Sequence, residues 1–267
     1  MKSTRVCLFD TGSMAIDGHK IYWNRGPAGD IRFPCYSALI EHEEGLFIVE
    51  TGFDLEFMTK FVSQDHALQS AEQTFPAQLA KVGYKPEDIT HIINTHLHID
   101  HCGCNHLFPQ ATVVCHVKEY ESAMKPELFE HLSYSAVGYF APQLVKRWRE
   151  IPEGVDPNLS PKFELLTGDV EFVPGVRLFE TVGHSAGHYS VMVELEGRRP
   201  MLFTGDASMT PKTLEMMVIG GFHLDPITAT RSLQRLKHLA AEHDAELFYS
   251  HNMPEFETWK KAPEWYA

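Results

Sequence analysis

Short apolar runs rich in β-branched residues alternate along the chain with longer amphipathic stretches. Runs of the first kind predict buried strands, and stretches with apolar residues every three or four positions predict helices. Strands are expected over Arg5–Phe9, Tyr36–His42, Leu46–Glu50, Ile89–Thr95, Thr112–His116, Val176–Val182, Tyr189–Leu195, Pro200–Thr204 and Glu246–Ser250. Helices are expected over Asp54–Val62, Thr74–Val82, Glu119–Met124, Ala141–Arg149 and Ile227–His243.

The order of these elements predicts an α/β fold. Strands come mostly in two batches, each followed by helices, and Glu43-Glu44-Gly45 separates two of the strands as a hairpin turn. Two sheets packed together, with helices on both outer faces, satisfy that order. At 267 residues the chain is expected to form a single domain over 1–267, in which the aromatic and proline-rich segment 125–162 could cap the site.

The composition narrows the class of protein. A net charge of −13 argues against a nucleic-acid partner, which would require a basic face. No run approaches the roughly 18 apolar residues of a membrane span. The apolar run Val6–Phe9 is too short for the core of a signal peptide. Five cysteines, an odd number, then suggest reduced thiols, so we expect a cytoplasmic protein without membrane or nucleic-acid partners.

The segment His96-Leu97-His98-Ile99-Asp100-His101 holds three imidazoles and a carboxylate within six residues. These ligand types suit zinc and its first-row neighbours. The segment directly follows the predicted strand Ile89–Thr95, so its side chains can converge on an ion without interrupting a sheet. A solvated histidine-rich turn is the alternative, but four potential ligands at this spacing favour a metal site.

Three more candidate ligands, His184, Asp206 and His251, follow the ends of other predicted strands. A lone histidine in such a place is more often structural, but the repetition indicates one shared site at the edge of the sheets. Seven ligands exceed the needs of one tetrahedral ion, so we expect two zinc ions, with Mn, Fe and Co as alternatives. The expected sets are His96, His98 and His184 for one ion and Asp100, His101 and His251 for the other, with Asp206 bridging.

A hydroxide between two such ions is an available nucleophile at neutral pH, because metals lower the pKa of bound water toward about 7. One ion would polarise a substrate carbonyl while the hydroxide attacks it. Asp206 and Asp100 are therefore the expected catalytic residues, and Asp100 or a bound water would return the proton to the leaving group. His188 and Ser185 are expected to orient the loop around His184.

The run His96-x-His98-x-Asp100-His101, with Gly183-His184, Asp206 and His251 after it, resembles the metallo-β-lactamase superfamily. The resemblance covers essentially the whole chain and implies a four-layer αββα sandwich. Asp206 stands where the zinc β-lactamases place a cysteine, which points away from true β-lactamases. His98 in place of a glutamate points away from the flavo-diiron branch.

Within that superfamily, Gly183–His188 and Lys260–Tyr266 are similar to the lactonase group that includes the N-acyl-homoserine lactonases. Four stretches outside the metal motif resemble the 4-pyridoxolactonases more closely: Tyr22–Pro27, Arg32–Ser37, Phe129–Ser135 and Phe222–Pro226. The resemblance implies a hydrolase that opens a small lactone fused to an aromatic ring. Hydrolysis of N-acyl-homoserine lactones is the first alternative.

Two departures from the lactonase pattern leave further alternatives open. Lactonases usually carry a tyrosine three residues after the bridging aspartate, where this chain has Met209, which cannot donate a hydrogen bond. Asn252 stands where an aspartate commonly follows the last metal-binding histidine. The substrate could therefore be a cyclic amide or carbamate fused to an aromatic ring. A non-catalytic metal-binding protein is the alternative from a different class.

Contacts to a small cyclic ester or amide substrate are expected from aromatic, basic and apolar side chains near the resemblance stretches. These candidates are Trp23, Arg25, Arg32, Phe33, Met209, Phe222 and His223, each of which also has a purely structural interpretation. The segment from Trp23 to Pro34 is apolar enough to close a pocket or to pair two subunits in a homodimer. Cys102 and Cys104, which flank the metal motif, are expected to be small buried residues.

Overall fold

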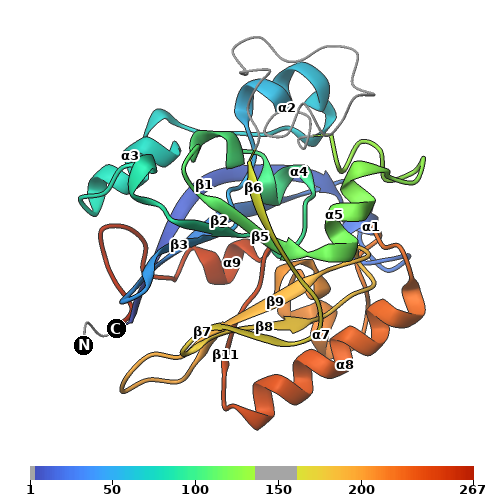
Figure 1. The fold of residues 1–267 in the computed structure, drawn as a ribbon. Coiled ribbons are helices and arrows are strands. Elements are labelled where there is room, and N and C mark those ends of the chain that lie inside the picture. The colour runs from blue at the N-terminus through green and yellow to red at the C-terminus, as the bar shows by residue number, and fades with distance from the viewer. Residues whose placement is uncertain (1–3, 136–160) are drawn as a thin grey trace.

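The structure, a computed structural model of the chain, describes residues 4–135 and 161–267, whose strands form two sheets packed face to face (Figure 1). The first sheet has the order β1 (Arg5–Asp17), β2 (Asp30–His42), β3 (Gly45–Val49), β4 (His91–Ile93), β5 (Thr112–His116) and β6 (Lys162–Leu166). The second has the order β11 (Glu246–Phe248), β10 (Met201–Phe203), β9 (Tyr189–Val193), β8 (Val176–Glu180) and β7 (Val170–Val173).

A hydrophobic core fills the space between the sheets. Because side chains alternate along a strand, β1 points Val6 and Leu8 into this core while Phe9 faces the other side of its sheet. Strand β9 does the same from the second sheet, with Val191 inside and Met192 outside. Each sheet is therefore buried on both faces, which requires a further layer on either side.

Helices supply the two outer layers (Figure 1). On the first sheet, α3 (Phe75–Lys81) buries Phe75 and Leu79 against the outer face. On the second, α8 (Pro226–Glu242) packs Leu233, Leu236 and Leu239 beside Leu202. The αββα sandwich that the sequence predicts is therefore confirmed.

Shorter helices lie near the ends of the strands. They are α1 (Gly18–Ile21), α2 (Leu55–Phe61), α4 (Ile99–Cys102), α5 (Val117–Met124), α7 (Pro211–Met216) and α9 (Met253–Phe256). Helix α2 matches the prediction over Asp54–Val62, because Asp54 caps its first turn by accepting the Phe57 N–H. The predicted helix Ala141–Arg149 and most of the predicted cap segment lie outside the described residues.

Several predicted boundaries were wrong. β1 continues beyond Phe9 to Asp17, and β2 begins at Asp30 instead of Tyr36, because the two strands pair with each other through polar positions that interrupt the apolar pattern. β6 and β7 were missed because their side chains are largely exposed or half-buried, which weakens the apolar signal. Helix α7 was missed because it has only six residues and depends on capping by Thr210.

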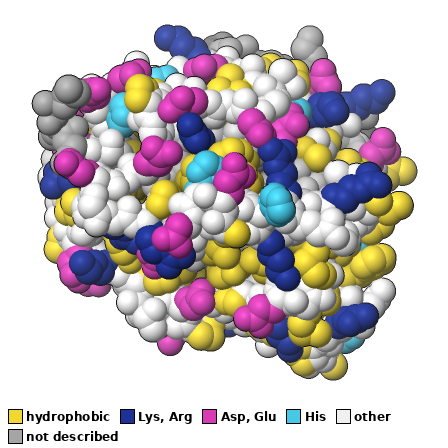
Figure 2. Space-filling view, turned by 90° about the horizontal axis from the view of Figure 1, so that it is seen from below, with side chains coloured by type: hydrophobic (Ala, Val, Ile, Leu, Met, Phe, Trp, Pro, Cys, Tyr) yellow, Lys and Arg dark blue, Asp and Glu magenta, His cyan; other side chains and the backbone are white. Residues whose placement is uncertain are grey.

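The surface gives no sign of a concentrated positive charge on the side that Figure 2 shows. Basic side chains on that face are interspersed with acidic ones (Figure 2). Within residues 4–135 and 161–267, no helix is both long enough and apolar enough to cross a membrane.

Candidate metal centre

The carboxyl ends of strands from both sheets meet at one edge of the sandwich. In the first sheet β3, β4 and β5 run parallel, and β4 leads into His96. In the second sheet β10 and β11 are parallel, and β8 runs the same way because β8 and β10 both pair antiparallel with β9. The loops after β8, β10 and β11 bring His184, Asp206 and His251 to this edge.

The first group of potential ligands joins the two sheets. His96 and His98 come from the loop after β4, and His184 comes from the loop after β8. Their ligand atoms lie within 4.8 Å of one another, and His98 Nδ1 is 3.1 Å from His184 Nε2. All three side chains are buried.

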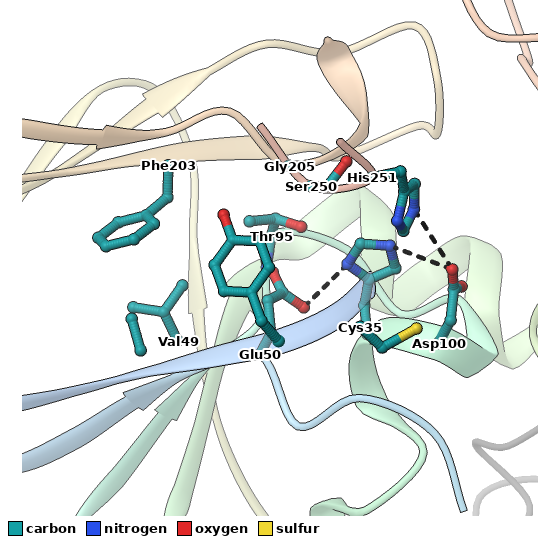
Figure 3. Close-up of a pocket in the computed structure, with 12 residues that line it drawn as sticks. Cys35, Val49, Glu50, Thr95, Asp100, Phe203, Gly205, Ser250 and His251 are labelled. Carbon is teal, nitrogen blue, oxygen red and sulfur yellow. Dashed lines mark hydrogen bonds and ion pairs between the residues drawn. The ribbon is translucent and has the colours of Figure 1, made fainter. Parts of the chain in front are cut away.

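The second group consists of Asp100, His101 and His251, whose ligand atoms also lie within 4.8 Å of one another. Asp100 Oδ2 is 3.6 Å from His101 Nε2 and 3.5 Å from His251 Nε2. Asp100 and His251 point toward each other in Figure 3, where a dashed line joins them. Helix α4 places Asp100 and His101 here, and the Pro34 carbonyl of β2 lies 3.3 Å from His251 Nδ1.

The carboxylate of Asp206 lies between the two groups. Its Oδ1 atom is 3.0 Å from His251 Nε2 and 3.3 Å from His101 Nε2, and its Oδ2 atom is 3.5 Å from His184 Nε2. One oxygen therefore faces each group, as a bridging ligand requires. Ser250 Oγ donates a hydrogen bond to Oδ1 at 2.8 Å, which holds the carboxylate in this orientation.

Burial and nearby charges shift the pKa values of the ligand residues differently in the two groups. Burial lowers the pKa values of His96 and His98 well below the ordinary histidine value, so both rings are neutral and able to bind a metal. Burial also acts to lower the pKa of His101, but nearby carboxylates outweigh it and raise that pKa well above its ordinary value. For Asp206, burial is outweighed by His251 and His101, which hold its pKa well below the usual range.

Metal ions fit this set of donors. The Nε2 atom of His96 is buried and has no hydrogen-bond partner among the described residues, although buried polar atoms normally have one. A third set, formed by His96, His101 and Asp206, connects the other two within the same 4.8 Å limit. Imidazole and carboxylate are ligands for zinc and for other first-row metals. The structure thus brings all seven predicted ligands together, while their role in binding metal stays a prediction.

Glu50 is a site residue that the sequence analysis did not single out. It follows β3 in a left-handed conformation with φ 64°, and its Oε2 atom lies 3.2 Å from His101 Nδ1 (Figure 3). Its Oε1 atom accepts the Thr95 N–H at 2.8 Å. A carboxylate on the far nitrogen of a ligand histidine fixes its tautomer and orientation. An acidic residue directly after a buried strand was the one available signal.

His188 stabilises the loop that carries Asp206. Its Nε2 atom accepts the Asp206 N–H at 2.9 Å, and its Nδ1 atom lies 2.9 Å from Thr181 Oγ1. His188 therefore holds the backbone of Asp206, in addition to its predicted place in the loop around His184. The neighbouring Gly205 has φ 52°, and a Cβ there would lie 2.6 Å from His188 Nε2, so the loop requires glycine at this position.

A cavity of about 300 Å³ opens onto the two groups. Three of the predicted substrate contacts, Phe33, Met209 and Phe222, line it. Lys20 of α1 also lines it, a residue that the sequence analysis missed. The remaining apolar lining includes Met14, Ile16, Ile99, Phe129 and Leu132.

The other predicted contacts lie elsewhere. His223 lines a side pocket of about 60 Å³ that shares His98 and His184 with the main cavity, and Trp23 packs against His223 with a ring distance of 4.5 Å. Arg32 donates to Ser13 Oγ and to the His66 carbonyl, because β2 points its side chain away from the cavity. Arg25 is exposed, and neither it nor Trp23 lines the main cavity.

Residues 30–251 match the metallo-beta-lactamase superfamily, a span that contains all seven predicted ligands. The chain belongs to this superfamily. Its relatives include an N-acyl homoserine lactonase of a Bacillus species, 31% identical over 99% of this chain and 100% of the relative. An N-acyl homoserine lactonase of Agrobacterium fabrum is 28% identical over the full length of both chains.

A solved structure that is similar to this chain supports the same grouping. It is an N-acyl homoserine lactone hydrolase with the product N-hexanoyl-L-homoserine bound at the catalytic metal centre. It is 27% identical, covers 100% of both chains and has a TM-score of 0.80. The predicted lactonase group is confirmed, and these relatives favour the acyl-homoserine alternative over a lactone fused to an aromatic ring. The closer likeness to 4-pyridoxolactonases stays a prediction.

Proposed function

We propose that the protein is a two-metal hydrolase that opens lactone rings, with N-acyl homoserine lactones as the first substrate class. The observation that carries this proposal is the position of Asp206, whose two oxygens face two separate groups of histidines. Full-length relatives that are N-acyl homoserine lactonases support the choice of substrate. Zinc is the proposed metal, and Mn, Fe and Co suit the same ligands.

Each group of residues would hold one ion. His96, His98 and His184 would bind the first, Asp100, His101 and His251 would bind the second, and Asp206 would contact both. Bound metals would supply positive charge for the carbonyl oxygen and acidify the attacking water. Glu50 and His188 keep the ligands oriented, so little reorganisation is needed during the reaction.

Asp100 is the proposed proton carrier. Both aspartates line the cavity, but the Asp100 side chain is 15% exposed, whereas that of Asp206 is 5% exposed and is engaged by Ser250 and His251. Asp100 is therefore the proposed residue that returns a proton to the leaving oxygen of a lactone bound in the cavity. The apolar cavity wall around Phe33 and Met209 would exclude competing water from the reacting centre.

A lactone or cyclic amide fused to an aromatic ring is the second candidate. The cavity is lined by three phenylalanines, Phe33, Phe129 and Phe222, which suit a flat ring. The side pocket adds Glu130 and His223, which can form hydrogen bonds with ring substituents. Met209 lines the main cavity at the position where lactonases usually have a tyrosine hydroxyl. Because methionine has no such hydroxyl, this position also favours a different substrate.

A substrate panel tests both candidates. Metal-loaded protein would be assayed on homoserine lactones with short, medium and long acyl chains, on 4-pyridoxolactone and on the corresponding cyclic amide. Highest kcat/KM on an acyl-homoserine lactone supports the first candidate, and a clear preference for a fused ring supports the second. If no lactone or amide is hydrolysed and Asp206→Asn alters only ligand binding, the protein is a non-catalytic metal-binding protein.

Location and assembly complete the proposal. All five cysteines are free and buried, which suits the reducing cytoplasm.

Trp23 is 42% exposed, so the segment from Trp23 to Pro34 has apolar surface that a second copy could cover. Sedimentation of the wild-type protein and of Trp23→Ser would test the proposed homodimer. If this segment forms the interface, the variant should sediment with a lower mass than the wild type.

A further inference from the structure

Helix α5 carries a carboxylate that contacts both loops of the first metal group. Glu119 lies in its first turn and is fully buried. Its Oε1 atom accepts the Leu97 N–H at 2.9 Å, and its Oε2 atom accepts the Gly187 N–H at 3.1 Å. Leu97 lies between His96 and His98, and Gly187 is three residues after His184. One side chain therefore connects the two loops that the first metal group requires.

The second loop lies directly against α5. A Cβ at Gly187 would be 2.4 Å from the Glu119 backbone nitrogen and 2.7 Å from His116 Nδ1, so only glycine permits this approach. The hydroxyl groups of Ser185 and Tyr134 also interact with the Glu119 carboxylate. The Tyr134 ring in turn packs on His98 with a centroid distance of 4.9 Å.

Burial of a carboxylate at this position costs free energy unless hydrogen bonds to it compensate for the lost solvation. Burial raises the pKa of Glu119, and the hydrogen bonds from the Leu97 and Gly187 N–H groups, together with the nearby Ser185 and Tyr134 hydroxyls, oppose that effect. A leucine could fill the same volume without the cost of desolvation, but it could not accept the two backbone N–H groups. The purpose indicated by the geometry is to fix the distance between the two loops.

We propose that Glu119 is a positioning residue that sets the geometry of the group His96–His98–His184 without contacting metal or substrate. This inference rests on the proposed two-metal function. It also distinguishes Glu119 from Glu50, whose side chain lies against a ligand of the other group. Glu50 supports the second group through His101, and Glu119 supports the first group through the loops.

Metal titration of the apoprotein tests this assignment. Cobalt(II) would be added to wild type and to Glu119→Gln, with bound metal counted by elemental analysis and ligand geometry followed by visible absorption. Loss of one carboxylate oxygen leaves one backbone N–H unpaired, and loss of such support typically costs about 10–100-fold in metal affinity. We expect that weakening for one ion per chain and no change for the other.

A matched control separates this effect from a general loss of stability. Glu41 of β2 is also a buried glutamate, but it accepts hydrogen bonds from Arg5 of β1 and from the Tyr84 hydroxyl, away from the metal groups. Glu41→Gln should leave both affinities unchanged. Tyr134→Phe is the milder test, because it removes one interaction with Glu119 and leaves both backbone hydrogen bonds in place, so it should weaken the same ion less.

Variants that retain one group identify the affected ion. In a His251→Ala background, which keeps the first group intact, Glu119→Gln should weaken the remaining cobalt site and change its spectrum. In a His98→Ala background it should change nothing. Equal weakening of both ions, or of neither, overturns the inference. A wild-type protein that binds no second ion contradicts the proposed function instead, so the two failures are distinguishable.

Discussion

Glu50 and His101 form an ion pair in which Glu50 Oε2 lies 3.2 Å from His101 Nδ1. The pair joins the end of β3 to α4 and turns the other ring nitrogen of His101 toward Asp206. Because Glu50 also accepts the Thr95 N–H, it holds the start of the metal motif as well. A single acidic side chain thus stabilises two parts of the same site.

Replacement of Glu50 by glutamine should weaken the second ion. The neutral amide can still occupy the position, but it no longer favours the His101 tautomer that donates from Nδ1. We expect about 10–100-fold weaker binding of one ion and a matching loss of kcat/KM at limiting metal. Competition with a chelator measures the affinity. Restoration of full activity by excess metal is expected, and an unchanged affinity would contradict the role of Glu50.

Asp206→Asn should have a larger effect on catalysis than on folding. The amide nitrogen cannot act as a ligand, so one of the two ions loses its shared oxygen. A decrease of at least about 10²-fold in kcat is expected, in the range for loss of one electrostatic stabilising group. Steady-state kinetics with measured metal content tests this. Asp244→Asn, at an exposed residue paired with Arg199, is the control and should retain wild-type rates.

Gly205→Ala should destabilise the loop that carries Asp206. The position has φ 52°, a conformation that costs a residue with a Cβ about 1–2 kcal/mol. The added methyl group would also contact His188 Nε2 at 2.6 Å. Urea unfolding should show a lower free energy of unfolding, together with weaker metal binding. Gly197→Ala shares the left-handed φ, 77°, but meets no atom within 4 Å, so it should show the backbone cost alone.

The pH dependence of stability should respond to Glu130. Burial raises the pKa of this carboxyl group from its ordinary value to about 7. A raised pKa means that the folded protein holds the proton more tightly, so this contribution to stability is complete below pH 4.5 and is lost as the pH rises through 7.

Glu130→Gln keeps the shape but cannot ionise, so its stability relative to wild type should rise between pH 5 and pH 8. Urea unfolding at several pH values within this window measures the difference. A constant difference between the two proteins across the window would show that Glu130 is not responsible.

Much of the site was predictable because each ligand follows an apolar run. His184, Asp206 and His251 could be placed together once the strands before them were recognised, since a strand ends at the edge of its sheet. The boundaries of β1 and β2 could not be predicted, because the two strands continue to pair with each other through polar positions that interrupt the apolar pattern.

Glu119 was not predictable as a member of the site, and Glu50 was marked only by its place directly after a buried strand. Each acts on backbone or ring atoms that are distant in sequence, so no local pattern reveals these contacts. Lys20 was missed for a similar reason. The Gly221 N–H donates to the Lys20 carbonyl, and this contact between distant turns brings α1 to the cavity. Arg32, unlike Lys20, was predicted to contact the substrate, but it lies on the face of β2 opposite to Phe33 and the cavity.

The proposed ligands come from loops of both sheets, and this has a consequence for synthesis on the ribosome. Four of the seven proposed ligands have been made once residue 101 is added, but His184, Asp206 and His251 arrive much later. A nascent chain can therefore display His96–His101 long before either group is complete. Acquisition of the proposed metals would then be a late step, and a truncated product that ends before β11 would lack His251 and hold an unfinished second group.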